Sequence, residues 1–105
     1  MPRAATTSDV FNAVAEPQRR AILALLITER PVSELVSSLG VAQPSVSKHL
    51  RVLREVGLVH VRKEGRQVLY RTNVEAIRPL HEWTSQFERL WRHQLSRIKE
   101  RAERR

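Results

Sequence analysis

The spacing of apolar and polar residues predicts several short helices, then a β-hairpin, then one long helix. The pattern is clearest in residues 42–58, AQPSVSKHLRVLREVGL, where the apolar residues recur at helical intervals. These residues are Val46, Leu50 and Leu53. Pro44 suits a first helical turn, where its missing N–H is not needed, and Gly57 suits the helix end. We therefore expect a helix with one apolar face and an opposite face that is polar and basic.

Three shorter helices are expected before this one. The first begins at Ser8, whose side chain can cap a helix, and the second begins at Pro17. The third follows Pro31 and ends at Gly40, which we expect at positive φ. The residues expected inside are Val10, Phe11, Val14, Ile22, Leu23, Leu25, Leu26, Ile27, Leu35, Val36 and Leu39.

The turn at residues 40–43 joins two short helices, which is the helix-turn-helix pattern. After it the period changes to that of strands: residues 58–63 and 67–72 flank a turn at residues 64–66 and predict a β-hairpin. The residues expected on its core side are Val59, Val61, Val68 and Leu69. The predicted fold class is mainly α with a small β-hairpin, a winged helix-turn-helix in the order α-α-α-α-β-β-α.

The last helix follows Asn73, with Pro79 expected to break or kink it before a body at about residues 80–103. The apolar residues of this body, here called the C-terminal stripe, are Leu80, Trp83, Phe87, Leu90, Trp91, Leu95 and Ile98. A single small domain seldom covers so long a stripe, so we expect a homodimer in which the stripe and Phe11 meet a second copy. The alternative is a stripe that folds back on its own core.

The chain has 105 residues, of which 41% are hydrophobic, and this predicts one folded domain at residues 8–105 with residues 1–7 disordered. The absence of cysteine excludes disulfides and thiolate metal sites. No apolar run is long enough for a membrane span, and the start lacks the apolar core of a signal peptide. We expect a cytoplasmic protein without a membrane partner.

Charge is distributed unevenly along the chain, whose net charge is +8. Residues 1–41 hold four basic and four acidic side chains, whereas residues 42–72 hold seven basic and two acidic ones. An excess of this kind fits nucleic acid, with an anionic membrane or an acidic protein as alternatives. Because the excess begins at the fourth helix, we predict that this helix contacts double-stranded DNA.

The candidate DNA-binding residues lie on the fourth helix and the hairpin: Gln43, Ser45, Ser47, Lys48, His49, Arg51, Arg54, Arg62, Lys63 and Arg66. The short polar residues at the helix start can pair with bases, and the long cations can reach bases or phosphates. Arg66 is expected at the hairpin tip in a minor groove. We place Ser47 nearer the buried edge than Ser45, and His49 is as plausible half-buried in the structure as on a phosphate.

Arg19 and Arg20 lie in the first turn of the second helix, a poor place for positive charge. We expect them to be solvated, with a phosphate contact or a salt bridge as the alternative. No catalytic constellation is present, so the chain is not expected to be an enzyme. A second class of function is a protein-interaction module that binds a partner through the C-terminal stripe.

Residues 10–70 resemble the ArsR/SmtB family of bacterial winged-helix regulators. The resemblance rests on VFNAVAEPQRRAILALL, on VSELVSSLGVAQPSVSKHLRVLREVGLV and on the hairpin RKEGRQVLYR. Its most specific part is the motif S-x-S-x-H-L-x-x-L-x-x-x-G-L-V of residues 45–59. The resemblance implies a homodimeric repressor that binds a partly palindromic operator, with the terminal helices in the dimer interface.

The chain departs from the family's metal sensors. Many members hold metals or arsenite with cysteines on the third helix, where this chain has Ser37 and Ser38, which are not soft ligands. Others use carboxylates and histidines on the last helix, where His81 and His93 are too far apart to meet on one helix. We expect no metal site and no cofactor, and the sequence does not identify an effector.

Overall fold

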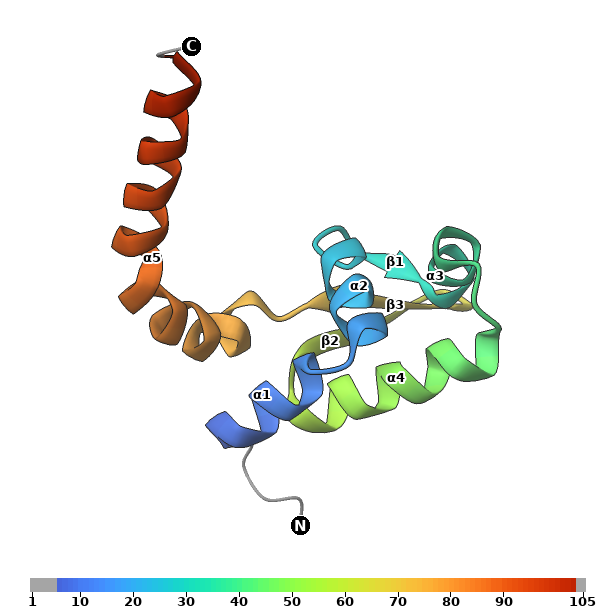
Figure 1. Cartoon of the computed structure of the whole chain (residues 1–105). Coiled ribbons are helices and arrows are strands. Elements are labelled where there is room, and N and C mark those ends of the chain that lie inside the picture. Colours follow the sequence, from blue (N-terminus) through green and yellow to red (C-terminus); the bar gives the residue numbers. More distant parts are fainter. Residues whose placement is uncertain (1–5, 104–105) are drawn as a thin grey trace.

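The computed structural model describes residues 6–103 (Figure 1). The elements in chain order are α1 Thr7–Val14, α2 Pro17–Leu25, β1 Arg30–Pro31, α3 Val32–Leu39, α4 Gln43–Val56, β2 Val59–Glu64, β3 Gln67–Thr72 and α5 Val74–Glu103. The predicted helices and hairpin are therefore all present. One element was not expected, because β1 adds a third strand to the sheet.

Helix α1 begins earlier than its predicted cap. Thr6 rather than Ser8 is the N-cap, and its hydroxyl accepts a hydrogen bond from the Asp9 backbone N–H. The Asp9 carboxylate accepts in return from the Thr6 backbone N–H, which completes a capping box. The predicted disorder of residues 1–7 is wrong for Thr6 and Thr7, and residues 1–5 lie outside the described part.

Helices α2, α3 and α4 surround one core. Its largest fully buried side chains are Ile22, Leu26, Leu35, Leu53, Leu58 and Val46. Helix α2 is shorter than its apolar run, because regular helix ends at Leu25 and the chain turns away. Ile27, which we predicted in the core, is consequently 72% exposed.

The three strands are antiparallel in the order β1-β3-β2. Val61 lies opposite Tyr70, and both pack against the core. Arg62 lies opposite Leu69, one position along each strand, so this pair faces the other side of the sheet. The prediction that Leu69 covers the core side is therefore wrong, although Leu69 is only 8% exposed.

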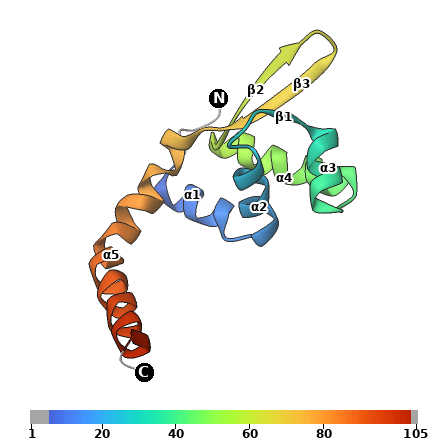
Figure 2. The same cartoon turned by 90° about the horizontal axis from the view of Figure 1, so that it is seen from above.

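Helix α5 continues through Pro79, so of the two predicted outcomes, a break or a kink, the break is wrong. Figure 1 shows the helix changing direction after its first turns. Its first turns pack on the core through Ala76, Ile77 and Leu80. The remainder leaves the body of the protein, as Figures 1 and 2 show, and gives the molecule a longest extent of 59 Å. The alternative in which the whole stripe folds back on its own core is therefore wrong. In the described part of the chain, no helix is both long enough and apolar enough to cross a membrane.

Candidate nucleic-acid interface

Two left-handed glycines delimit α4. Gly40 ends α3 at φ 64° and directs the chain into the turn before α4, as predicted. Gly57 ends α4 at φ 84°, and its backbone N–H donates to the carbonyl oxygens of Leu53 and Arg54. Since glycine adopts this conformation at the lowest steric cost, the sequence determines both ends of the helix-turn-helix locally.

Helix α4 is held by one face and exposed on the other. Val46, Leu50 and Leu53 are 0%, 2% and 0% exposed in the core. The exposed residues of the helix are Gln43, Pro44, Ser47, Lys48, Arg51, Arg54 and Glu55. Within residues 6–103, the three cations of this set make no ion pair, so their charge is available to an acidic partner.

The burial of the two serines near the start of α4 is the reverse of what we expected. Ser47, which we placed nearer the buried edge, is exposed, whereas Ser45 is half-buried. The reason is the helical period: Ser47 shares the exposed side with Arg51 and Arg54, while Ser45 lies on the flank with His49. Ser47 is thus better placed than Ser45 to meet a ligand.

His49 occupies a half-buried position on α4. Its Nδ1 atom is buried and has no hydrogen-bond partner in the described structure. His49 is therefore half-buried, as one of the two alternatives predicted, and the phosphate contact stays a prediction. Because Nδ1 is buried, a ligand outside the protein can reach His49 only at another part of its ring.

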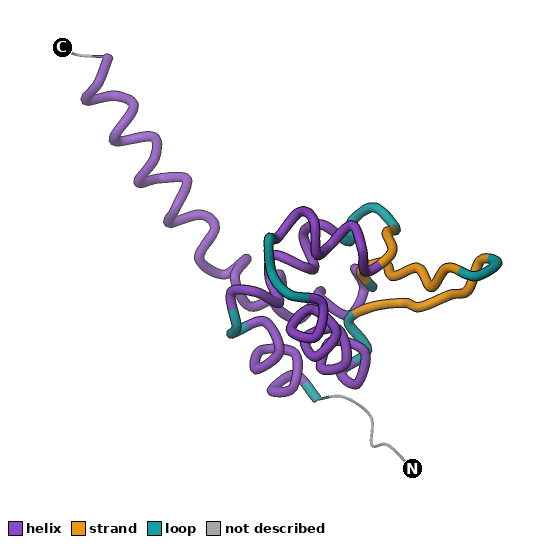
Figure 3. Tube along the Cα trace, turned by 90° about the vertical axis from the view of Figure 1, so that its right-hand side faces the viewer, coloured by secondary structure: helices purple, strands orange, loops and turns teal. Residues whose placement is uncertain are grey.

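The hairpin of β2 and β3, here called the wing, projects beyond β1 (Figures 2 and 3). Its turn contains Gly65 at φ 62° and Arg66, and Lys63 precedes it on β2. Lys63 and Arg66 are exposed, and neither has an ion-pair partner among residues 6–103. Figure 2 shows the wing and α5 projecting from opposite sides of the body. Among the described residues, unpaired positive charge is present on both α4 and the wing.

Arg62 differs from the other cations of the wing. Its guanidinium donates to both carboxylate oxygens of Glu29, at 2.8 and 2.6 Å, and also to Glu64 at 3.1 Å. The hydrogen bonds and charge of Arg62 hold the pKa of the Glu29 carboxyl below its ordinary value. Two carboxylates already compensate Arg62, so it is a poorer candidate for a phosphate contact than we expected.

Within residues 6–103, Arg19 and Arg20 make hydrogen bonds to backbone carbonyls rather than salt bridges. Arg19 donates to the carbonyl oxygens of Asn12 and Ala13, and Arg20 donates to those of Val14 and Ala15. These carbonyls lie at the C-terminal end of α1, where the last carbonyls have no i+4 partner, so the two guanidinium groups stabilise this end of the helix. The sequence signal for this role is a pair of arginines at the start of the next helix.

A second surface lies on α5. The described residues of the C-terminal stripe beyond Leu80 are 37–65% exposed, with Phe87 the least and Leu95 the most. Trp83 and Phe87 meet edge to face at 5.4 Å between centroids, and Phe87 stacks on Trp91 at 6.3 Å. Phe11 of α1 joins this row through Trp83, so four of the predicted interface residues form one continuous row of aromatic rings.

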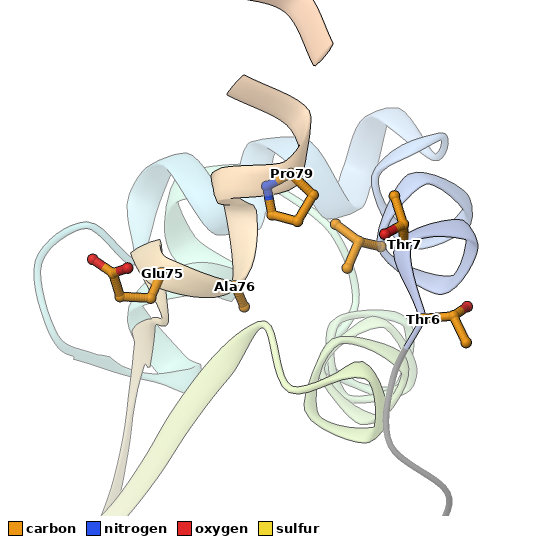
Figure 4. Close-up of a pocket in the computed structure, with 6 residues that line it drawn as sticks. Thr6, Thr7, Glu75, Ala76 and Pro79 are labelled. Carbon is orange, nitrogen blue, oxygen red and sulfur yellow. The ribbon is translucent and has the colours of Figure 1, made fainter. Parts of the chain in front are cut away.

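A cavity of about 230 Å³ separates α1 from the first turns of α5. Thr6, Thr7 and Val10 line it from α1, and Glu75, Ala76 and Pro79 line it from α5 (Figure 4). None of the predicted site residues is among them. In residues 6–103, no three side chains of the metal-binding types gather closely enough to hold an ion.

Several known proteins are similar to this chain in sequence and in fold. Residues 16–61 match the bacterial regulatory protein arsR family. The HTH-type transcriptional repressor SmtB of Mycobacterium tuberculosis is 47% identical over 64 residues, which cover 60% of this chain and 47% of that protein. The arsenic resistance transcriptional regulator ArsR2 of Pseudomonas putida is 39% identical over 80 residues, covering 73% of this chain and 69% of that one.

The chain belongs to the ArsR family. Among solved structures, an ArsR-like transcriptional regulator from Rhodococcus sp. RHA1 superposes with a TM-score of 0.68 at 29% identity, covering 91% of this chain and 92% of that one. ArsR-family proteins and the relatives named here are transcriptional regulators rather than enzymes. The chain spans about half the length of the first curated relatives that it matches.

Proposed function

We propose that this ArsR-family protein is a homodimeric transcriptional repressor that binds a partly palindromic operator in double-stranded DNA. The observation that carries the proposal is the exposed face of α4, where Lys48, Arg51 and Arg54 make no ion pair with any residue of the described range 6–103, while the opposite face is buried. A helix held in this way can enter a major groove with its side chains directed at base edges and phosphates. Repression follows when the bound dimer occupies a promoter.

The contacts of each protomer divide into reading and positioning. Gln43, Ser47, Lys48 and Arg51 read bases or nearby phosphates from the exposed face of α4, with Arg54 closer to the backbone. Ser45 and His49 are at the edge of this surface. On the wing, Lys63 contacts phosphate and Arg66 enters the minor groove. Arg62 is assigned to holding the wing rather than to a phosphate.

A homodimer is the arrangement that covers the C-terminal stripe. Exposed apolar surface of this extent marks an interaction site, and the row from Phe11 to Trp91 is already ordered within one protomer. A two-fold axis at α5 brings two copies of α4 to half-sites about one helical turn, ~10 base pairs, apart. We further propose that the repressor does not sense metals, because it has no cysteine and because His81 and His93 lie 12 residues apart on α5.

The test begins with genome-wide mapping of bound sites and footprinting of the operator found. The paired substitution Lys48→Ala with Arg51→Ala should abolish operator binding and leave the dimer intact. Arg89→Ala with Arg92→Ala is the matched control, because it removes the same charge from α5 away from the stripe. Unchanged operator affinity in the α4 variant would overturn the assignment of the reading face.

The alternative function is a protein-interaction module in which the stripe binds a foreign helix. Truncation after Pro79 separates the two functions, because a dimeric repressor should become a monomer that binds the operator poorly. A truncated protein that stays dimeric would show that the interface lies elsewhere. Operator affinity should also fall steeply with salt, since several phosphates are neutralised, and a salt-independent affinity would contradict DNA binding by these cations.

A further inference from the structure

The root of the wing is defined by one row of residues across the sheet. Arg62 of β2 lies opposite Leu69 of β3, which in turn lies opposite Pro31 of β1. Strand β1 contributes only Arg30 and Pro31, so this row is the last with three strands before the tip. Residues 63–68 beyond it form a two-stranded ribbon, as Figure 2 shows. A two-stranded ribbon has little stability of its own, so its direction depends on what holds its root.

Leu69 is covered although it faces away from the main core. Its exposed fraction is 8%, yet the side chains of the central core do not include it. Its neighbours across the sheet on that face are Arg62 and Pro31. The aliphatic part of a long cationic side chain can cover apolar surface in this way while its head remains polar.

The guanidinium of Arg62 is fixed by the segment that precedes β1. Glu29 lies between α2 and β1, and it accepts two hydrogen bonds from Nε and one Nη of Arg62. This two-point geometry fixes the orientation of a guanidinium more firmly than a single contact. The two side chains of this pair are 53% and 28% exposed, close to the 33% and 54% of the Arg30–Glu34 pair, but Arg30 makes only one hydrogen bond to Glu34.

From this geometry we propose that Glu29 and Arg62 form a clamp that sets the direction of the wing, making Glu29 a positioning residue for the DNA contacts of Lys63 and Arg66. The proposal rests on the proposed DNA-binding function for its consequence, but the clamp itself is a property of the free protein. Glu29 is acidic and would repel a phosphate directly. Its effect on DNA binding therefore passes through Arg62 and the strands that Arg62 holds.

The opposite hypothesis is that Arg62 binds a DNA phosphate and that its ion pair with Glu29 competes with this contact. The two hypotheses differ in sign for Glu29→Gln. Loss of a clamp lowers operator affinity, by roughly tenfold if one or two charge-assisted hydrogen bonds of the tip are weakened. It also reduces the steepness of the salt dependence, by about 0.9 in the log–log slope for each phosphate that is no longer neutralised. If Arg62 were instead freed to bind a phosphate, both the operator affinity and the steepness of its salt dependence would rise.

Three further variants make the test specific. Arg62→Lys keeps the charge but not the two-point geometry, so it should weaken operator binding as Glu29→Gln does. The exchange of both residues, Glu29→Arg with Arg62→Glu, should bind the operator more tightly than either single substitution. Glu34→Gln is the control, because it removes the same charge from a single-contact pair with Arg30 that does not include the wing, and it should leave affinity within about twofold.

Hydrogen exchange on the free protein tests the clamp without DNA. In Glu29→Gln, the backbone amides of residues 63–68 should exchange several times faster, while those of α4 keep their wild-type rates. Unchanged exchange in the wing would overturn the clamp, and so would stronger or unchanged operator binding by Glu29→Gln. If the wild-type protein bound no DNA at all, the proposed function would fail, and the exchange result would still decide whether the clamp exists.

Discussion

The rings of Phe11 and Trp83 meet edge to face, with centroids 5.7 Å apart and planes at 87°. Edge-to-face geometry is favourable for aromatic pairs, and here it joins α1 to α5 across most of the chain. The row continues along α5 to Phe87 and Trp91. In the proposed homodimer, the partner helix would meet a surface that is already ordered, which lowers the entropy cost of association.

Leu95→Glu tests whether this surface is the dimer interface. Leu95 is 65% exposed in the protomer, so the substitution should not disturb its folding. In a dimer it places an unpaired carboxylate in an apolar contact, which should raise the dimer dissociation constant by about 100-fold or more. Sedimentation equilibrium measures this constant. Ser96→Glu adds the same charge on the other side of α5 and should leave the constant unchanged, and equal effects of the two would refute the assignment.

The two serines of α4 provide a second test, of the reading face. Ser47 is exposed and Ser45 half-buried, so only Ser47→Ala should remove a hydrogen bond to the operator. One such bond contributes about 1 kcal/mol, or roughly fivefold in affinity. Fluorescence anisotropy with the footprinted operator gives the two dissociation constants. The face would be assigned wrongly if Ser45→Ala weakened binding while Ser47→Ala did not.

The parts of the fold that could be predicted are those with local causes. The ends of α4 follow from two glycines that adopt positive φ at low cost and from a proline in its first turn. The buried face of α4 follows from the 3.6-residue period, which a 14-residue helix displays clearly. The same period should have placed Ser47 on the open side, so that error came from the interpretation of the sequence and not from a missing signal.

The parts that could not be predicted depend on tertiary contacts. Strand β1 has two residues and exists only because β3 offers it a free edge. Leu69 lies on the opposite face of the sheet from Val61 and Tyr70 because the register of the strands decides the face, with Arg62 and Pro31 beside it. Ile27 continues an apolar run past the end of α2, where the turn of the chain exposes it. The ion pair of Glu29 with Arg62 spans 33 residues, and no local pattern indicates it.

Gly40→Ala tests how much the turn before α4 depends on a left-handed glycine. A Cβ at this position would meet no atom within 4 Å, so the cost comes from φ of 64° alone. That cost should be about 1–2 kcal/mol in the free energy of unfolding. Urea unfolding at one fixed protein concentration measures it. Gly40→Asn should cost less than Gly40→Ala, because asparagine adopts this conformation more readily, and the reverse order would contradict the explanation.

The clamp at the root of the wing should fail in acid. Arg62 lowers the pKa of the Glu29 carboxyl below its ordinary value of 4.5, through hydrogen bonds first and charge second, and Arg71 adds a weaker effect of the same sign. The folded-state pKa thus lies below the unfolded one, so the stability from this group is complete above about pH 4.5. It is lost as the pH falls through the lower, folded-state value, where the carboxyl takes up a proton and Arg62 remains charged.

We therefore expect hydrogen exchange in residues 63–68, corrected for its intrinsic pH dependence, to be constant from pH 7 to pH 5. Below about pH 4.5 it should rise towards the rate of Glu29→Gln, which should show no such step. Glu64 also contacts Arg62, so Glu64→Gln is the matched variant. It should keep the step, because Glu29 alone makes the two-point contact. A wild-type profile identical to that of Glu29→Gln across this range would show that the carboxylate of Glu29 does not hold the wing.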